Sequence, residues 1–439
     1  MRLALYFLLA LSPLPLASAR PVWQWGWILF IAVCALAAAI HIMRGKEQRS
    51  ALLHLPAIPV FCVTLFGLWG LFQALVPLFP GHFDLLPELT TLSIFPEQTI
   101  KVSLLFLAHA ALFVVVFLYA RGRSGRGNAL LKLIAALGAL YALYGFVVYI
   151  SGTNLVLWFE KTAYKNVVTS TFVNRNSYAA YAGLGLAAMN VILFLKVDAL
   201  KNQRAGPRDY LLTVFAGHGW YQALAYLVLV SALLLTGSRA GILSVLAAQA
   251  VMVFLFFGNA GGRGKLYVAI GILAAFIALF ALSGELLVSR IVDNDEINER
   301  FVVYGYVWRA ILEQPLSGHG LGTFNEAFRL YRGEDVRLYF DRAHNDYLEI
   351  FMTAGVPAAM VLLVAPTHLM VRYLKAAVRS MDIEKRAFSG MGVAVLVQLA
   401  LHSLLDFSLQ MPAVSILFVT LLALVSAKLV GQDKGAKSG

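Results

Sequence analysis

His344 is the residue of this chain best suited to acid–base chemistry. It stands in the segment Arg-Ala-His-Asn-Asp-Tyr-Leu-Glu, where a long polar stretch enters an apolar run. A neutral imidazole exchanges protons near neutral pH and can accept one from an attacking hydroxyl. Asn345, Tyr347 and Glu349 follow it closely, and Glu349 already falls in the apolar run, where acids are costly and usually functional. The alternative is an interfacial histidine without chemistry.

Two arginines stand where a helix is expected to begin. Arg239 lies in the turn Thr-Gly-Ser-Arg-Ala-Gly between two apolar runs, so its guanidinium could bind phosphate oxygens at headgroup height. The alternative is an arginine that reaches lipid phosphate. Arg175 lies beside the cap candidates Asn176 and Ser177 and could form an anion site with the helix N-terminus, or the segment could be a simple cap.

Arg300 and Arg342 belong to the longest polar segment, at about 284–346. Helical spacing places Arg300 and Tyr304 on one face of a predicted amphipathic helix on the membrane surface. Arg300 could reach an anionic substrate or pair with a neighbouring glutamate. Arg342 precedes His344, so the histidine lies beneath an arginine-rich loop, which suggests chemistry on a lipid-borne anion.

An acid at the end of a later apolar run completes the set of candidates. Asp406 lies in His-Ser-Leu-Leu-Asp-Phe and could orient a base, bind sugar hydroxyls or cap the turn before Pro412. A metal site built on His344 with nearby acids is the competing interpretation. The spacing matches no zinc pattern and HExxH is absent, so we expect no metal and no cofactor.

These residues must be positioned by membrane helices. Apolar residues make up 60% of the 439 residues and charged residues 13%, about half the charge of a typical soluble domain. The apolar runs are long and do not alternate, which excludes a β-barrel and predicts an all-α polytopic membrane protein. We expect twelve spans, at about 3–18, 24–42, 52–77, 102–120, 129–150, 177–195, 219–236, 240–257, 267–283, 347–371, 388–405 and 412–430.

The domain organisation follows from these spans. Helices 1–9 occupy 1–283, a periplasmic loop domain with catalytic residues occupies 284–346, helices 10–12 occupy 347–430, and a cytoplasmic tail occupies 431–439. The first segment also resembles a signal peptide, with Ala-Ser-Ala before Arg20. We expect it to be retained as a helix. The glycine-dense stretch at 315–324 predicts a close-packed turn in which His319 is structural.

The basic residues indicate the orientation of the chain. The net charge is +12, and 22 of the 35 Lys and Arg residues fall on one set of short connectors, against 6 of the 23 acids. By the positive-inside rule this side is cytoplasmic, with both termini. The excess of positive charge is therefore a topology signal and does not indicate a nucleic-acid partner. His344, Arg239, Arg300 and Asp406 fall on the external face.

Five segments together resemble the O-antigen ligase/Wzy polymerase superfamily of bacterial membrane glycosyltransferases. They are 171–176, 236–241, 300–324, 344–349 and 402–407. The resemblance implies a fold of the GT-C type with a large periplasmic loop, in the inner membrane, and a glycan donor carried on undecaprenyl pyrophosphate. It implies that Arg239 and Arg300, with Arg175 as a weaker match, hold the pyrophosphate and that His344 is the catalytic base. The family pattern commonly has a small or branched residue where His319 stands.

Four functions fit this resemblance to different degrees. An O-antigen ligase, which transfers a finished glycan to lipid A–core, is favoured. The runner-up is a Wzy-type polymerase, whose acceptor is a lipid-linked repeat unit. A protein O-glycosyltransferase is less favoured. A transporter would place charged residues near the middle of the bilayer, whereas here the charges gather at the faces.

Overall fold

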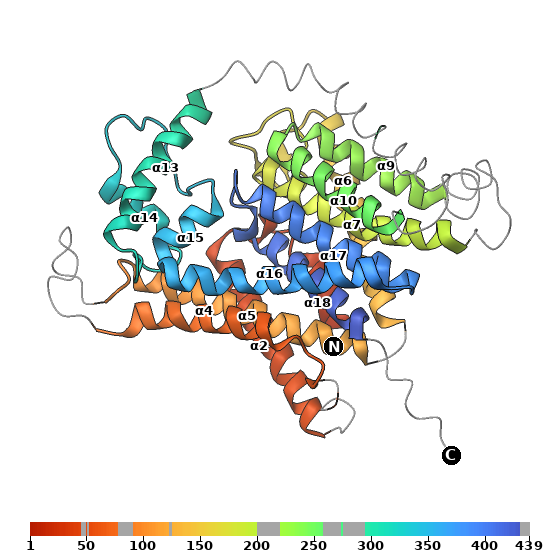
Figure 1. The fold of residues 1–439 in the computed structure, drawn as a ribbon. Coiled ribbons are helices and arrows are strands. Elements are labelled where there is room, and N and C mark those ends of the chain that lie inside the picture. Colours follow the sequence, from red (N-terminus) through yellow and green to blue (C-terminus); the bar gives the residue numbers. More distant parts are fainter. Residues whose placement is uncertain are drawn as a thin grey trace.

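The structure is a computed structural model that describes residues 1–44, 50, 52–77, 91–122, 125–199, 220–257, 274 and 295–430. Long helices lie side by side in one bundle, and three helices gather at one end of it (Figure 1). The bundle helices are α1 (Arg2–Leu11), α2 (Pro21–Arg44), α4 (Ala57–Leu75), α5 (Pro96–Arg121), α6 (Arg126–Ile150), α7 (Arg175–Ala199), α9 (Trp220–Leu235), α10 (Arg239–Phe257), α16 (Val356–Arg379), α17 (Ile383–His402) and α18 (Pro412–Val430). The end helices are α13 (Asp295–Glu313), α14 (Phe324–Tyr331) and α15 (Asp346–Ala354).

The prediction of an all-α polytopic membrane protein is confirmed. Eight helices of the described part are long and apolar enough to cross a membrane, namely α2, α4, α5, α6, α7, α10, α16 and α18. The shorter α1 and α9 are also apolar. The one sheet in this part is a hairpin of β1 (Leu155–Val156) and β2 (Phe159–Glu160). The predicted span at 267–283 lies outside the described residues, so twelve spans stay a prediction.

Two predicted spans were wrong as single helices. The segment 3–18 is helical only to Leu11, because Pro13 and Pro15 cannot continue the helix, and it ends in the short 3₁₀ turn η1 (Leu16–Ser18). The segment 347–371 is two helices, α15 and α16, which are separated at Gly355. Gly355 has a φ of +82° and lies so close to the carbonyl of Leu316 that a side chain would not fit.

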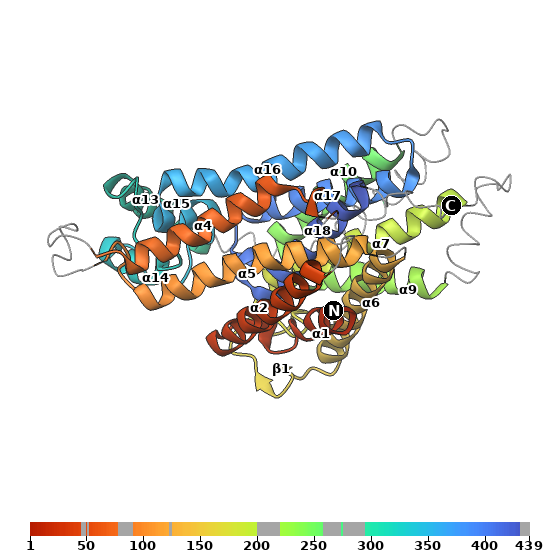
Figure 2. The ribbon, with the colours of Figure 1, turned by 90° about the horizontal axis from the view of Figure 1, so that it is seen from below.

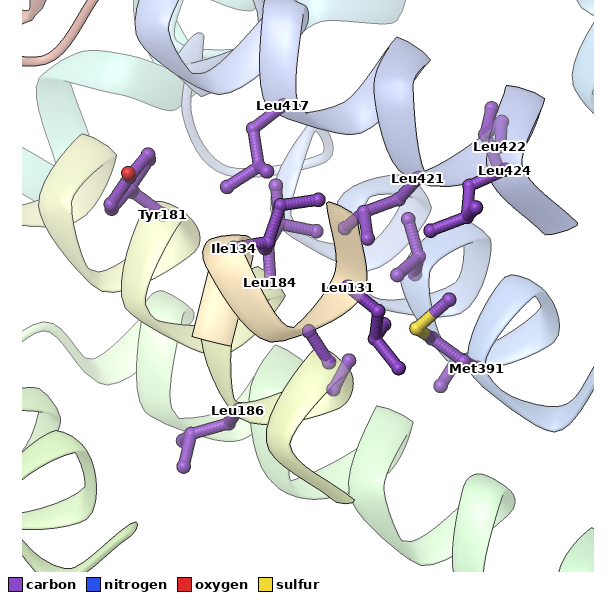
Figure 3. Packing of buried hydrophobic residues seen from close by; sticks show 14 of the residues in the cluster. Leu131, Ile134, Tyr181, Leu184, Leu186, Met391, Leu417, Leu421, Leu422 and Leu424 are labelled. Atoms are coloured by element: carbon purple, nitrogen blue, oxygen red, sulfur yellow. The ribbon is translucent and has the colours of Figure 1, made fainter. Parts of the chain in front are cut away.

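The core of the bundle lies around α7, which is buried along almost its whole length. Figure 3 shows leucines of α6, α7 and α18 packed together with Met391 of α17. Gly138 and Gly185 face each other and allow α6 and α7 to approach closely. This core gives α7 a fixed position, so the residues at its N-terminus are held rigidly.

The end helices have a small core of their own and are attached to the bundle by α4. Val303, Phe324 and Phe328 are fully buried in that core, between α13, α14 and α15. Gln73 of α4 donates hydrogen bonds to the carbonyls of Ser317 and Thr353, and its amide oxygen accepts one from the backbone of Leu321. A buried amide with three partners is a specific attachment, because each lost bond would leave a polar group unsatisfied.

The glycine-dense stretch is the close-packed turn that its composition predicts. Gly318, Gly320 and Gly322 all have positive φ, and a side chain on any of them would collide with Thr353, Ser93 or Val102. His319 is buried within this turn, where its Nδ1 lies 3.1 Å from the carbonyl of Met352 and its Nε2 lies 2.9 Å from the hydroxyl of Tyr331.

Two residues predicted on the basic side meet at one carboxylate. Lys428 and Asn128, both predicted on the basic side, contact the same carboxylate of Glu384 at 2.7 Å. The helices α13, α14 and α15 lie at one end of the bundle, and the connection between α16 and α17 lies at the other (Figures 1 and 2).

Candidate active site

His344 is held in an unusual backbone conformation between two aromatic rings. Its φ is +53°, in the left-handed region that a branched or bulky residue enters only when its surroundings hold it there. The hydroxyl of Tyr304, on α13, donates a hydrogen bond of 3.1 Å to the carbonyl of His344. The ring of Phe407 meets the imidazole edge to face at 4.9 Å, and Phe340 lies on another side. The imidazole is therefore aimed by its environment.

The carboxylate of Asp406 lies beside this imidazole. Nδ1 of His344 is 4.0 Å from Oδ1 of Asp406, whose side chain is fully buried while that of His344 keeps 15% exposure. The second carboxylate oxygen accepts a hydrogen bond from the amide of Asn176, and Oδ1 accepts one from the backbone of Phe407. Two donors thus fix the carboxylate close to the imidazole, which stays partly accessible.

Arg300 reaches the same place from α13. Its guanidinium donates a hydrogen bond of 3.1 Å to the carbonyl of Leu405, the residue next to Asp406. Glu299, one of the partners expected for Arg300, accepts a hydrogen bond from the backbone of Leu338. Arg300 is therefore brought to the site by α13, as the helical spacing predicts.

Arg175 and Arg239 each occupy the first position of a helix. The backbone of Asn176 donates to the side chain of Asn174 before α7, and the backbone of Gly241 donates to the hydroxyl of Ser238 before α10. The first turn of a helix also carries the positive end of the helix dipole, which favours anions. Both ends are thus suited to phosphate.

These two helix ends are packed against each other. A side chain at Gly241 would come within 2.5 Å of Ala179 of α7, so this glycine is required for the contact between the helices. The guanidinium of Arg175 lies 5.3 Å from the ring of Tyr164, and its Nε is buried without a hydrogen bond among the described residues. Arg239 is half-buried and has no hydrogen bond or ion pair in the same part of the chain. Among the described residues, Arg239 makes no hydrogen bond or ion pair with His344.

The other candidates around His344 have structural partners. Asn345 caps α15 by accepting a hydrogen bond from the backbone of Leu348. Tyr347 donates to the carbonyl of Ala400 on α17. Arg342 lies 3.4 Å from Glu349, which also accepts from the backbone of Ala343. Glu349 was expected inside a span, but it is buried in α15, a helix of nine residues that is too short to cross a bilayer.

From the sequence, Asp346 was considered only as one of the acids of the competing metal site. It is 4% exposed and accepts hydrogen bonds from Ser403 and Gln410 at 2.7 and 2.9 Å. Burial raises the pKa of this carboxyl from 3.8 to about 7, although both hydrogen bonds favour the charged form. Asp346 therefore joins the start of α15 to the segment that carries Asp406.

We expect Asp346 to make stability fall as the pH rises. The unfolded carboxyl ionises near pH 4, whereas the folded one keeps its proton until about pH 7, so stability present below pH 4 is lost between these values. A shift of this size corresponds to about 4 kcal/mol. Asp346→Asn cannot ionise, so its melting temperature should decline less than that of the wild type between pH 5 and pH 8. Asp382→Asn, at the exposed cap of α17, is the control. Equal slopes in wild type and Asp346→Asn would contradict the assignment.

The residues between α17 and α18 (403–411, here called the site connector) meet three of the helices that position the site. It includes the 3₁₀ turn η3 (Ser408–Gln410). The connector contacts α7 through Asp406, α13 through Leu405, and α15 through Ser403 and Gln410. Only Asp406 was predicted. The polar residues at 403 and 410, in an otherwise apolar stretch, were the available signal.

The acids near His344 do not converge on one point, because each of them has its own hydrogen-bond donor. Asp346 faces the site connector and Glu349 faces Arg342, and the described residues contain no group of three or more His, Cys, Asp or Glu side chains placed to hold a metal ion. What the arrangement offers is an imidazole 4.0 Å from a buried carboxylate, near an arginine and the N-terminus of α7.

Comparison with known families gives one match. Residues 224–363 match the family model described as O-antigen ligase. This range includes Arg239, Arg300, Arg342 and His344. No curated protein matches the chain.

Proposed function

We propose that this chain, which belongs to the O-antigen ligase/Wzy superfamily through its match at residues 224–363, is an O-antigen ligase. In the proposed reaction a glycan moves from undecaprenyl pyrophosphate to a sugar hydroxyl of lipid A–core. The observation that carries this proposal is the meeting of His344, Asp406 and Arg300 beside the N-terminus of α7. A base next to cationic groups is the equipment needed to attack a sugar whose leaving group is an anion.

His344 is the general base in this proposal. Its Nδ1 faces Asp406, so its Nε2 is the nitrogen that accepts the proton of the acceptor hydroxyl. The hydroxyl oxygen forms a bond to the anomeric carbon while the bond from that carbon to the phosphate oxygen breaks. A single displacement inverts the anomeric centre. Asp406 stabilises the imidazolium that forms, as a buried carboxylate does beside other catalytic histidines.

The arginines hold the leaving group. Undecaprenyl pyrophosphate departs with its negative charge, and cations aimed at the phosphates stabilise that charge without a metal ion. Arg300 lies against the segment that carries Asp406. Arg239 and Arg175 each add a guanidinium to a helix N-terminus. Because α7 and α10 touch near these ends, the two phosphates of one pyrophosphate can be shared between them.

The positive-inside rule supports a site at the end of the bundle that lies outside the cytoplasm. We propose an inner-membrane protein with a periplasmic site and cytoplasmic termini. The lipid tail of the donor then stays in the bilayer beside the spans, while its pyrophosphate reaches the site at headgroup height. Tyr304, Asn345, Tyr347, Arg342 and Glu349 support the site by fixing α13 and α15 around His344.

The identity of the acceptor is the decisive test. We expect purified protein, supplied with a glycan on undecaprenyl pyrophosphate, to transfer it to lipid A–core and not to a second lipid-linked repeat unit. The same reaction should proceed in EDTA, because arginines replace the metal. Transfer only to repeat units would establish a Wzy-type polymerase instead. Activity lost in EDTA and restored by a divalent ion would overturn the metal-independent mechanism.

A further inference from the structure

His402 is a buried histidine that the proposed mechanism does not use. It is the last residue of α17 and is 1% exposed. Its Nδ1 lies 3.3 Å from the hydroxyl oxygen of Ser244 on α10. The same hydroxyl donates its own proton to the carbonyl of Gly241, at 2.9 Å. The ring therefore donates from Nδ1 to the Ser244 hydroxyl oxygen. Its Nε2 is then unprotonated and has no hydrogen bond among the residues described.

The backbone of His402 makes the second half of a link. Its carbonyl accepts hydrogen bonds of 3.0 Å from the backbone of Leu405 and from that of Asp406. Leu405 in turn accepts from Arg300, and Asp406 faces His344. One residue thus holds α10 with its ring and the turn of the site connector with its carbonyl.

We propose that His402 is a positioning residue that fixes the distance between the phosphate-binding end of α10 and the base. Ser244 lies five residues after Arg239, about 7.5 Å along the helix. A link there holds Arg239 in register with Asp406, and through Asp406 with His344. This inference rests on the proposed function, in which Arg239 holds the leaving group and His344 the attacking hydroxyl on opposite sides of one carbon.

The link between His402 and Ser244 affects the register of α10 against α17 more than the overall stability. α10 packs along α17 over much of its length, so the two helices stay together when one hydrogen bond is lost. They are then free to slide, and a misplacement of about 1 Å between reacting groups can cost up to about 10²-fold in rate. Loss of the link should therefore lower kcat while leaving the binding of the donor almost unchanged.

The test uses full-length protein in which either side of the link is removed. We expect His402→Leu and Ser244→Ala each to lower kcat for transfer by about tenfold, with the KM for the donor within about twofold of wild type. The double variant should lose no more than the worse single variant, because both remove the same link. His402→Asn should restore kcat, since its amide nitrogen can donate from about the position of Nδ1. Thr367→Ala removes a hydroxyl that bonds only within its own helix and is the control.

Hydrogen–deuterium exchange gives a readout that does not depend on transfer. His402→Leu and Ser244→Ala should both speed exchange in peptides that cover 238–244 and 402–407, and His402→Asn should reverse this effect. Unchanged exchange in both peptides, additive losses in the double variant, or wild-type kcat in His402→Leu would each overturn the proposal. Wild-type protein that transfers no glycan, yet shows the expected exchange, would overturn the proposed function and leave the link established.

Discussion

His344→Ala is expected to lower glycan transfer by about 10²- to 10⁴-fold, the range that a positioned general base contributes. The physical reason is that the acceptor hydroxyl then has no group to take its proton, while the arginines still bind the donor. The KM for the donor should therefore change little. Transfer should be measured with purified protein whose elution on size exclusion and melting temperature match the wild type. Full activity in the folded variant would remove the assignment of His344 as the base.

Two further substitutions separate the chemistry of His344 from its packing. His54→Ala removes an exposed histidine that contacts only the carbonyl of Ser50 among the described residues, and it should keep wild-type activity. Asp406→Asn keeps the shape of the side chain but removes the charge that stabilises the imidazolium, so it should also lower kcat strongly. If Asp406→Asn were as active as the wild type, Asp406 would only be a cap of the turn before Pro412.

The sequence predicted the composition of the site better than its geometry. Sidedness was predicted from the basic connectors that mark one face, and it stays a prediction. The position of Arg300 also followed from sequence, since helical spacing aims it and Tyr304 in the same direction. The contact of Asp406 with Asn176 could not be predicted, because 230 residues separate them and only the packing of α7 against the site connector brings them together.

The misjudged helices show a second limit of reading a membrane sequence. Hydropathy detects apolar length, and it does not detect where a chain turns inside an apolar stretch. α15 ends at Gly355, where φ is positive and any side chain would collide with Leu316 of the 315–324 turn. This is a contact between distant segments. Pro13 and Pro15, in contrast, were visible signals that a helix could not continue to residue 18. Asp346, Ser403 and Gln410 form a network between α15 and the site connector, which are distant in sequence, so no local pattern marked it.

Arg239→Ala is expected to lower kcat/KM for the pyrophosphate donor by about 10²- to 10³-fold, the loss found when one donor to a developing oxyanion is removed. Arg239 has no ion pair or hydrogen bond within the described residues, so its removal leaves no buried charge uncompensated and should leave the fold intact. Negative charge grows on the leaving phosphate as the bond breaks, so kcat should fall more than KM rises.

Arg239→Lys distinguishes the geometry of the guanidinium from its charge. A lysine restores the positive charge but cannot bind two phosphate oxygens in parallel, so we expect it to recover only part of the lost rate. Inhibition by added undecaprenyl pyrophosphate should weaken in the order wild type, Arg239→Lys, Arg239→Ala, because the product keeps the group that Arg239 binds. Arg309→Ala, which removes an exposed arginine paired with Glu313 on α13, is the matched control and should behave as wild type. If it impaired transfer as much as Arg239→Ala, the effect of both would be general surface charge, and α10 would not carry a phosphate site.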